Sequence, residues 1–243
     1  MKSLIRFSFL ALALFSATSV TAQEISLSFG DDASLAGRSI QLLALVTILS
    51  IVPGLAIMIT CFPFIVTVLA ILRQAIGLQQ SPPNMLIVSL ALFLTYFVME
   101  PVFIESWTLG IGPLSTGELE IEPALANAIS PFRDFMALRI DPNTFQTLTD
   151  IRPQSSTSED IASAPLSLMI PSFLLSEIER AFQVGFLIFL PFLIIDLVVA
   201  AILMSMGMMM VPPAIVSLPF KLAFFVIADG WSLVSASLVS SYY

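Results

Sequence analysis

The 243-residue chain contains no histidine, a single cysteine and few charged side chains. Without histidine there can be no Ser-His or Cys-His nucleophile pair, no histidine zinc helix and no imidazole proton shuttle. Cys61, inside an apolar run, can form neither an intrachain disulfide nor a cysteine-rich metal site. A net charge of −8 disfavours nucleic acid as a partner. We therefore expect no enzyme activity, no cofactor and no metal site.

Charged residues make up only 11% of the chain, whereas apolar residues make up 58% and the mean hydropathy is +1.00. A soluble globular domain carries about 25% charged residues, which cover its surface. This chain cannot cover itself in that way, so it needs the lipid bilayer or an equally apolar partner around it. The composition predicts a membrane protein.

The first residues have the pattern of a secretory signal peptide. Lys2 and Arg6 form a short positive region, residues 7–15 are almost wholly apolar, and small residues precede Gln23. The apolar core is too short to span a bilayer, which takes about 20 apolar residues. We expect cleavage between Ala22 and Gln23, with the new amino terminus outside the cytoplasm.

Four apolar segments follow and predict an all-α membrane protein, made of two long helical hairpins with a small helical insertion between them. An outside amino terminus and four crossings place both hairpin turns in the cytoplasm and the insertion outside it. The expected parts are a signal peptide (1–22), an extracytoplasmic N-terminal segment (23–39), a first hairpin (40–104) with a cytoplasmic turn (73–84), an extracytoplasmic insertion (105–171), and a second hairpin (172–243) with a cytoplasmic Met-rich turn (204–213).

The first apolar segment is longer than a bilayer requires. Leu42 to Leu72 is an uncharged run of 31 residues, about 46 Å as a straight helix, against a hydrocarbon core of about 30 Å. Pro53 and Pro63 interrupt the run, and each removes an intrahelical hydrogen bond. We expect kinks or a break at these prolines.

Local signals predict further elements. Ser130 and Pro131 have the residue types of an N-cap and a first helical position, so we expect a helix to begin there. Residues 154–158 predict an exposed, mobile loop. The pattern is helical from Ser172 to Met206, and the last apolar segment runs from residue 214 to about residue 239.

Three charged residues, Asp196, Lys221 and Asp229, interrupt apolar runs. A charge at membrane depth costs at least about 2.5–3.5 kcal/mol unless it finds a partner or water. The midpoint of positions 196 and 221 is 208.5, inside the predicted turn, so antiparallel helices bring both side chains to similar depth, about 19 Å from the turn. We predict an ion pair between Asp196 and Lys221, within one hairpin or between neighbouring copies. It would stabilise assembly; a proton or ion relay is the alternative.

Five of the 11 methionines lie between Met204 and Met210, at the expected cytoplasmic turn. Three interpretations are open on the residues alone. The side chains could pack flexibly, since methionine fills irregular gaps, or their thioethers could bind Cu(I). They could also form a deformable seal around a pore.

Seven stretches of the sequence occur in an order and spacing that are characteristic of one known family. They are PFLIIDLVVAAILMSMGMMMVPP (191–213), SEIERAFQVGF (176–186), PPN (82–84), LALFLT (90–95), PFRDFM (131–136), LPFK (218–221) and DGW (229–231). Together they resemble the FliP family, membrane proteins of the flagellar type III export gate. The resemblance extends over roughly residues 40–239.

This resemblance implies a channel subunit of the bacterial inner membrane, in the flagellar basal body. Such a subunit assembles as a pentameric ring with FliQ- and FliR-like subunits, beside FlhB- and FlhA-like export components, and passes unfolded rod, hook and filament subunits. The matching gasket residues at the pore constriction would be Met208, Met209 and Met210, with Met204 and Met206 as further candidates. The candidate buried charges for assembly would be Asp196, Lys221, Asp229 and Glu177.

One position departs from the family pattern. Members commonly carry an arginine where this chain has Phe64, so no site is carried over to that residue. Injectisome homologues are a close alternative, but they usually lack a cleaved signal peptide, and residues 1–22 favour the flagellar system. A small-solute or metal transporter, with the three intramembrane charges as a relay, is the alternative of another class.

Overall fold

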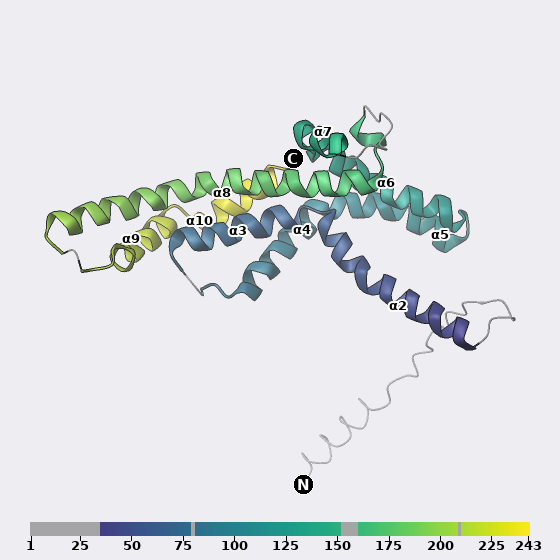
Figure 1. Ribbon diagram of the computed structural model, residues 1–243, viewed down its shortest axis with the longest axis horizontal. Helices are drawn as coiled ribbons and strands as arrows, with labels where there is room; N and C mark the ends of the chain where they lie inside the picture. The colour runs from purple at the N-terminus through teal and green to yellow at the C-terminus, as the bar shows by residue number, and fades with distance from the viewer. Residues whose placement is uncertain (1–34, 79–80, 152–159, 209) are drawn as a thin grey trace, which may run out of the picture. The chain divides into compact units, whose positions relative to one another are not determined.

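The computed structural model describes residues 35–78, 81–151, 160–208 and 210–243, and every regular element among them is a helix (Figure 1). The predicted signal peptide with its cleavage site at Ala22 and Gln23, and the predicted loop at 154–158, lie outside these residues. The chain divides into two compact units, Met1–Leu49 and Ser50–Tyr243. The elements are α2 (Leu35–Met58), α3 (Phe62–Ile76), α4 (Asn84–Ser106), the π-helical turn η1 (Trp107–Ile111), α5 (Gly112–Thr116), α6 (Ile121–Arg139), α7 (Pro142–Ile151), the 3-10 turn η2 (Ile161–Ser163), α8 (Leu166–Ser205), α9 (Pro213–Ile227) and α10 (Gly230–Ser240).

Among the described residues, three helices are long and apolar enough to cross a membrane: Ser39–Met58, Asn84–Thr116 and Leu166–Ser205. The bent pair α9 and α10 makes a fourth if it is taken as one span. At 1.5 Å per residue the 40-residue α8 is about 60 Å long, twice the thickness of the hydrocarbon core. The predicted all-α class is confirmed, and three or four helices able to span a membrane stand where four apolar segments were predicted. α8 is longer than one crossing needs.

The first apolar segment breaks at only one of its two prolines. α2 runs through Pro53 and ends at Met58, whereas α3 begins at Phe62 with Pro63 in its first turn. A proline in the first turn costs no hydrogen bond, because the N–H groups there have no intrahelical partner. Inside a long helix such as α2, a proline removes one bond of many. The segment therefore forms two helices, and α3 is too short to be counted as a span.

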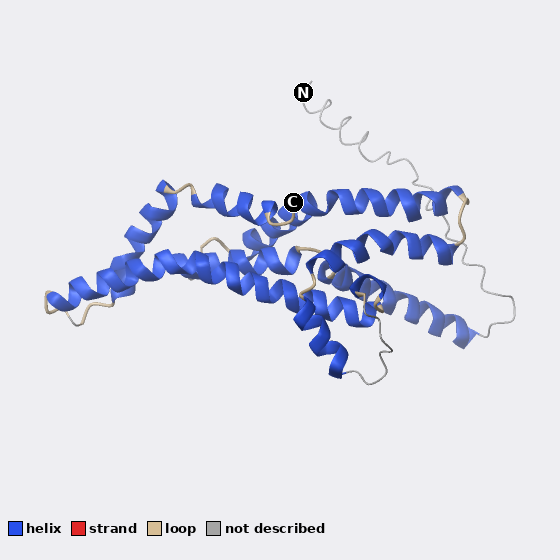
Figure 2. Ribbon diagram, turned by 90° about the horizontal axis from the view of Figure 1, so that it is seen from above, coloured by secondary structure: helices blue, strands red, loops and turns tan. Residues whose placement is uncertain are grey.

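α3 lies at the centre of the larger core, where it packs against α8, α4 and α9 (Figures 1 and 2). Its buried residues recur every three or four positions on one broad face, and the rest of the helix is half-buried except at Gln74, which is exposed. These residues are Phe64, Ile65, Val68, Leu69, Leu72, Ala75 and Ile76. A helix with so little exposed surface is the scaffold on which the longer helices are placed.

A second core joins the insertion to the first part of α8. It contains buried residues of α6, α7 and α8, namely Met136, Ile140, Phe145, Ala164, Leu168, Met169 and Phe173, with Ala164 just before α8. The prediction that a helix begins at Ser130 is wrong, because α6 begins at Ile121 and runs through Pro131. The hydroxyl of Ser106 donates to the Ala128 carbonyl at 2.7 Å, in the turn before that proline. The bond that the proline removes is the one to the Asn127 carbonyl, and the Ser106 bond attaches the next carbonyl along α6 to α4.

The turn between α8 and α9 follows directly from its residue types. Gly207 adopts a left-handed conformation with φ 77°, which costs glycine nothing. Its N–H donates to the Met204 carbonyl at 3.1 Å, and the N–H of Met208 donates to that of Leu203 at 3.0 Å. This Schellman pattern satisfies the last carbonyls of α8. Pro213 then opens α9 at a position where no N–H is needed.

The sequence suggested one continuous last segment, but the structure divides it into two helices. α9 ends at Ile227 and α10 begins at Gly230, with a bend of 61° between them. A Cβ atom on Gly230 would lie 2.1 Å from the ring of Phe225, so the ring occupies space that only glycine leaves free. The bend packs an aromatic side chain tightly against the start of α10.

At Gly185, α8 packs tightly against Ile71 of α3. A Cβ atom there would lie 2.5 Å from Cδ1 and 3.1 Å from Cγ2 of Ile71. We expect Gly185→Ala to push the two helices apart and lower the free energy of unfolding by about 1–3 kcal/mol. Thermal unfolding of the purified protein in detergent micelles measures this. Gly54→Ala is the matched control, because no heavy atom lies within 4 Å of a Cβ there. Equal stabilities of the two variants would contradict the tight contact.

Candidate functional site

The predicted ion pair between Asp196 and Lys221 forms within the chain. The Lys221 ammonium donates to Oδ2 of Asp196 at 2.6 Å, across the α8–α9 hairpin. The hydroxyl of Ser217, one turn before Lys221 on α9, donates to the other carboxylate oxygen, Oδ1, at 2.6 Å. Both oxygens of this carboxylate therefore have a donor, as a charge in apolar surroundings requires.

Lys221 also joins a third helix to this pair. Its side chain is 7% exposed, and its ammonium donates to the Ala75 carbonyl at 3.1 Å. Ala75 stands in the last turn of α3, where carbonyls lack an intrahelical donor and a cation is favourable. Asp196 is 34% exposed. Lys221 thus ties α3, α8 and α9 together, while one side of the pair stays open to whatever surrounds the chain.

A second buried ion pair lies further along α8, at Glu177. This carboxylate is fully buried, and the guanidinium of Arg139, at the end of α6, donates from Nε to its Oε1 at 2.8 Å. The phenol of Tyr242 donates to Oε2 of the same carboxylate. The Nη1 group of Arg139 donates to the Ser241 carbonyl at 3.0 Å. The prediction named Glu177 as a buried charge but gave it no partners.

No pattern in the sequence points to Arg139 or Tyr242, because neither residue interrupts an apolar run. Arg139 lies 38 residues before Glu177 and Tyr242 lies 65 residues after it. The sequence does not distinguish Arg139 from Arg133, the other arginine of α6. In the structure Arg133 donates to the Ala162 and Ala164 carbonyls instead. The one signal of a distant partner was that the hairpin places no basic residue at the depth of Glu177.

Phe64 and Cys61 lie beside this second pair. Phe64 is buried, its ring meets that of Tyr242 edge-on at 5.7 Å, and the Arg139 guanidinium lies 5.8 Å from its centroid. Cys61, between α2 and α3, is fully buried, and burial raises the pKa of its thiol from 9.0 to about 12. Burial, and next the Glu177 carboxylate, raise the pKa of Tyr242 above its ordinary value. Both groups therefore stay protonated at neutral pH, and Tyr242 remains a donor.

Asp229 was predicted to be a buried charge for assembly, and within the single chain it is not buried. The residue is exposed, at the bend between α9 and α10, with a left-handed backbone (φ 48°). Aspartate tolerates this conformation better than most residues. Among the described residues its side chain forms no ion pair and no cap hydrogen bond. The break in the helix, which the continuous segment of the prediction lacked, is what brings Asp229 to the surface.

The methionines of the α8–α9 turn are exposed wherever the structure describes them. The exposed fractions are 60% for Met204, 67% for Met206, 43% for Met208 and 98% for Met210, while Met209 lies outside the described residues. These four side chains do not pack in the chain's own core. Flexible packing against other chains, a Cu(I) site and a pore seal all stay open. The turn presents thioethers outward at the end of the hairpin.

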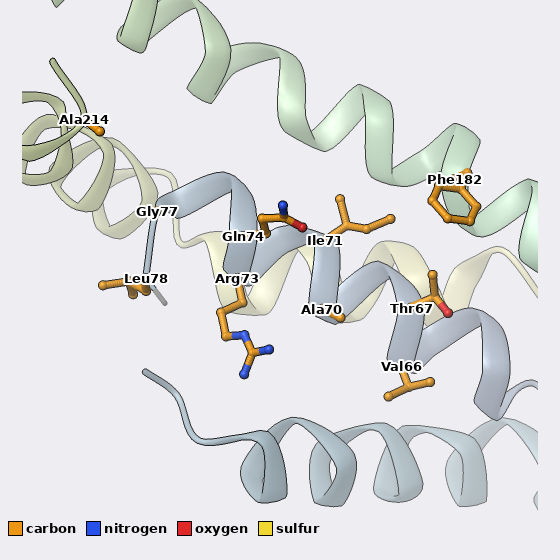
Figure 3. A pocket seen from close by; sticks show the side chains of 10 residues that line it. All are labelled: Val66, Thr67, Ala70, Ile71, Arg73, Gln74, Gly77, Leu78, Phe182 and Ala214. Carbon is orange, nitrogen blue, oxygen red and sulfur yellow. The ribbon is translucent and has the colours of Figure 1, made fainter. Parts of the chain in front are cut away.

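A groove of about 850 Å³ runs beside α3, between residues of α8 and α9 (Figure 3). Its lining contains one charged side chain, Arg73, which points toward the start of α4. There the guanidinium donates to the side-chain oxygen of Asn84, and to the Pro82 carbonyl at 3.4 Å. Arg73 therefore holds the α3–α4 connection, and the remaining lining is largely apolar. Such a groove offers packing surface and no paired carboxylates for acid-base chemistry.

These observations define a class: a helical protein with three or four helices able to span a membrane, internally paired charges and extensive exposed apolar surface. A model of the FliP family matches residues 45–238. The chain is 48% identical to the flagellar biosynthetic protein FliP of Caulobacter vibrioides (96% of this chain, 87% of that protein). It is 47% identical to that of Rhizobium meliloti (87% and 86%) and 40% to that of Bacillus subtilis (90% and 98%). The chain belongs to the FliP family, a family of flagellar biosynthesis and protein export.

Removing the Lys221 ammonium tests the first ion pair. Lys221→Met leaves the Ala75 carbonyl without this donor and Asp196 with Ser217 alone, so we expect a loss of about 1–3 kcal/mol in the free energy of unfolding in micelles. The double exchange Asp196→Lys with Lys221→Asp restores the charge pair but not the bond to Ala75, and should recover only part of that loss. A Lys221→Met protein as stable as the wild type would contradict the assignment.

Proposed function

We propose that this chain is a pore-forming subunit of the flagellar type III protein export gate. The observation that carries the proposal is the exposed methionine turn at the end of a hairpin in which Asp196 and Lys221 are already paired with each other. The family membership supplies the system, and the outward-facing thioethers supply surfaces that can close against copies of themselves. Unbranched, polarizable side chains suit a seal that yields to a passing chain.

In this proposal Met208, Met209 and Met210 line the constriction, with Met204 and Met206 on the approach to it. Repeated copies of the chain, five by resemblance to the family, bring the turns together. FliQ- and FliR-like subunits complete the ring, and FlhB- and FlhA-like components work beside it. The assembly lies in the inner membrane at the flagellar basal body and passes unfolded rod, hook and filament subunits.

The extent of uncovered apolar surface supports assembly. Leu43, Phe93, Phe186 and Ile227, on four different helices, are 63% to 86% exposed. Soluble monomers rarely expose contiguous apolar patches of more than a few hundred Å². Lipid can cover part of this surface, but α8 is about twice as long as the hydrocarbon core is thick. Neighbouring subunits account for what lipid cannot cover.

The buried charges take structural roles in this proposal. Glu177 and the Asp196–Lys221 pair hold the hairpins of each subunit in the shape that the ring needs. Asp229, exposed at its bend, is available for a contact with a neighbouring subunit. Because Lys221 is already bound to Asp196 and Ala75, a relay that needs a freely exchanging proton at Lys221 is disfavoured.

The methionine seal has a direct test. We expect Met208→Ala with Met210→Ala to let small molecules leak across the membrane of cells that carry assembled gates, because alanine leaves the constriction open. Dye uptake and growth in salt measure the leak. Met85→Ala is the matched control, since Met85 is likewise exposed (81%) but lies at the start of α4. A leak of the same size from Met85→Ala, or none from the double variant, would count against the seal.

A clean deletion separates this proposal from the transporter alternative. Cells without the chain should lose motility and filament secretion, and retained secretion would refute the export role. A small-solute or metal transporter predicts instead that the purified chain alone, in liposomes, takes up solute. Copper in the purified protein would favour a thioether metal site over the seal.

A further inference from the structure

The two residues that follow α10 turn back into the protein. The Ser241 carbonyl accepts from Nη1 of Arg139 at 3.0 Å, and the phenol of Tyr242 donates to Oε2 of Glu177. Arg139 and Glu177 also bind each other at 2.8 Å. The end of α10 is therefore bound by both members of a buried ion pair, one on α6 and one on α8.

The Tyr242 ring is also held by its neighbours. It stacks on Phe135 of α6 at 5.9 Å with planes 14° apart, and it meets Phe64 of α3 edge-on. The guanidinium of Arg139 lies 4.1 Å from its centroid, within the range of a cation–π contact. Tyr243, the next residue, is 78% exposed. The side chain of Tyr242 is thus specifically inserted, and its neighbour of the same type is not.

α10 has few other means of staying in place. It has 11 residues, and among them only Gly230, Val234 and Leu238 are buried. A helix of this length is marginal by itself in water, and its other end is the bend at Asp229. Regions with few buried apolar contacts open at lower free energy than the rest of a structure. The contacts of Ser241 and Tyr242 attach the end of this helix to Arg139 and Glu177 by polar bonds.

We propose that Ser241 and Tyr242 form a latch, which closes on Arg139 and Glu177, fixes α10 in place and can open without unfolding of the rest of the chain. The bend at Asp229 is then the hinge on which α10 moves. This inference concerns the chain by itself and does not rest on the proposed export role.

The chain carries its own reporter for the latch. Cys61, the single cysteine, is fully buried and packs in the same core cluster as Tyr242. The charges of Glu177 and Arg139 both act on its thiol. Opening of the latch exposes this part of the core, so the rate at which N-ethylmaleimide alkylates Cys61 measures the open fraction.

The experiment compares Tyr242→Phe with Tyr243→Phe in the purified full-length protein in micelles at pH 8. Tyr242→Phe keeps the ring and removes only the hydroxyl that binds the Glu177 carboxylate. Losing a hydrogen bond to a charged group should raise the rate at which Cys61 is alkylated about 10- to 100-fold. Tyr243→Phe should alkylate at the wild-type rate. Mass spectrometry of the intact protein follows the reaction.

A second cysteine distinguishes local opening from unfolding. Ala164→Cys, in a Cys61→Ala background, places a thiol in the second core cluster, where Ala164 is fully buried. Adding Tyr242→Phe should leave alkylation at position 164 unchanged. Glu177→Gln keeps an acceptor for the phenol but loses the charge. Its Cys61 alkylation rate should rise by less than that of the double variant Glu177→Gln with Tyr242→Phe. Unchanged protection of Cys61 in Tyr242→Phe, or equal acceleration at both positions, would overturn the latch.

Discussion

Two of the three carboxylates on the apolar helix α8 determine how the rest of the chain is arranged. Glu177 and Asp196 lie 19 residues apart on α8 (196 − 177), about 28 Å along its axis. Each needs a cation, because an unpaired charge in apolar surroundings is strongly unfavourable. Arg139 at the end of α6 and Lys221 on α9 provide them. The insertion, through α6, and the second arm of the last hairpin, α9, are thereby attached to α8 at two separate points.

The two pairs differ in how closed they are, and this difference separates their roles. Glu177 is fully buried and its ligands come from α6 and from the residues after α10, so this pair holds the protein's interior together. Asp196 is one-third exposed and lies nearer the methionine turn. A buried ion pair fixes the positions of the helices that carry it. A partly exposed pair leaves part of its carboxylate accessible to neighbouring molecules. The hairpin that carries the methionines is thus firmly attached to α3 and still presents a surface.

Several features followed from the residues because they depend on short stretches of sequence. The α8–α9 turn is set by Gly207 and the prolines after it. The pairing of Asp196 with Lys221 follows from the symmetry of an antiparallel hairpin about that turn, which puts residues at equal distance from the turn at equal depth. Helix content and the number of long apolar helices follow from the length of the uncharged runs.

Other features required the tertiary structure, because they depend on contacts that no local pattern encodes. Pro131 lies inside α6, one turn after the carbonyl of Ala128 that the Ser106 hydroxyl of α4 binds, although Ser130 and Pro131 have the residue types of a helix start. The bend at Asp229 depends on the ring of Phe225 against Gly230. The sequence by itself determined that the long uncharged runs are helical, that the surface is apolar and that charges 196 and 221 lie at similar depth. Only the tertiary structure decided that Arg139 and Tyr242 complete the site of Glu177, because partners 38 and 65 residues away are brought together by packing of whole helices and leave no periodic trace in the chain.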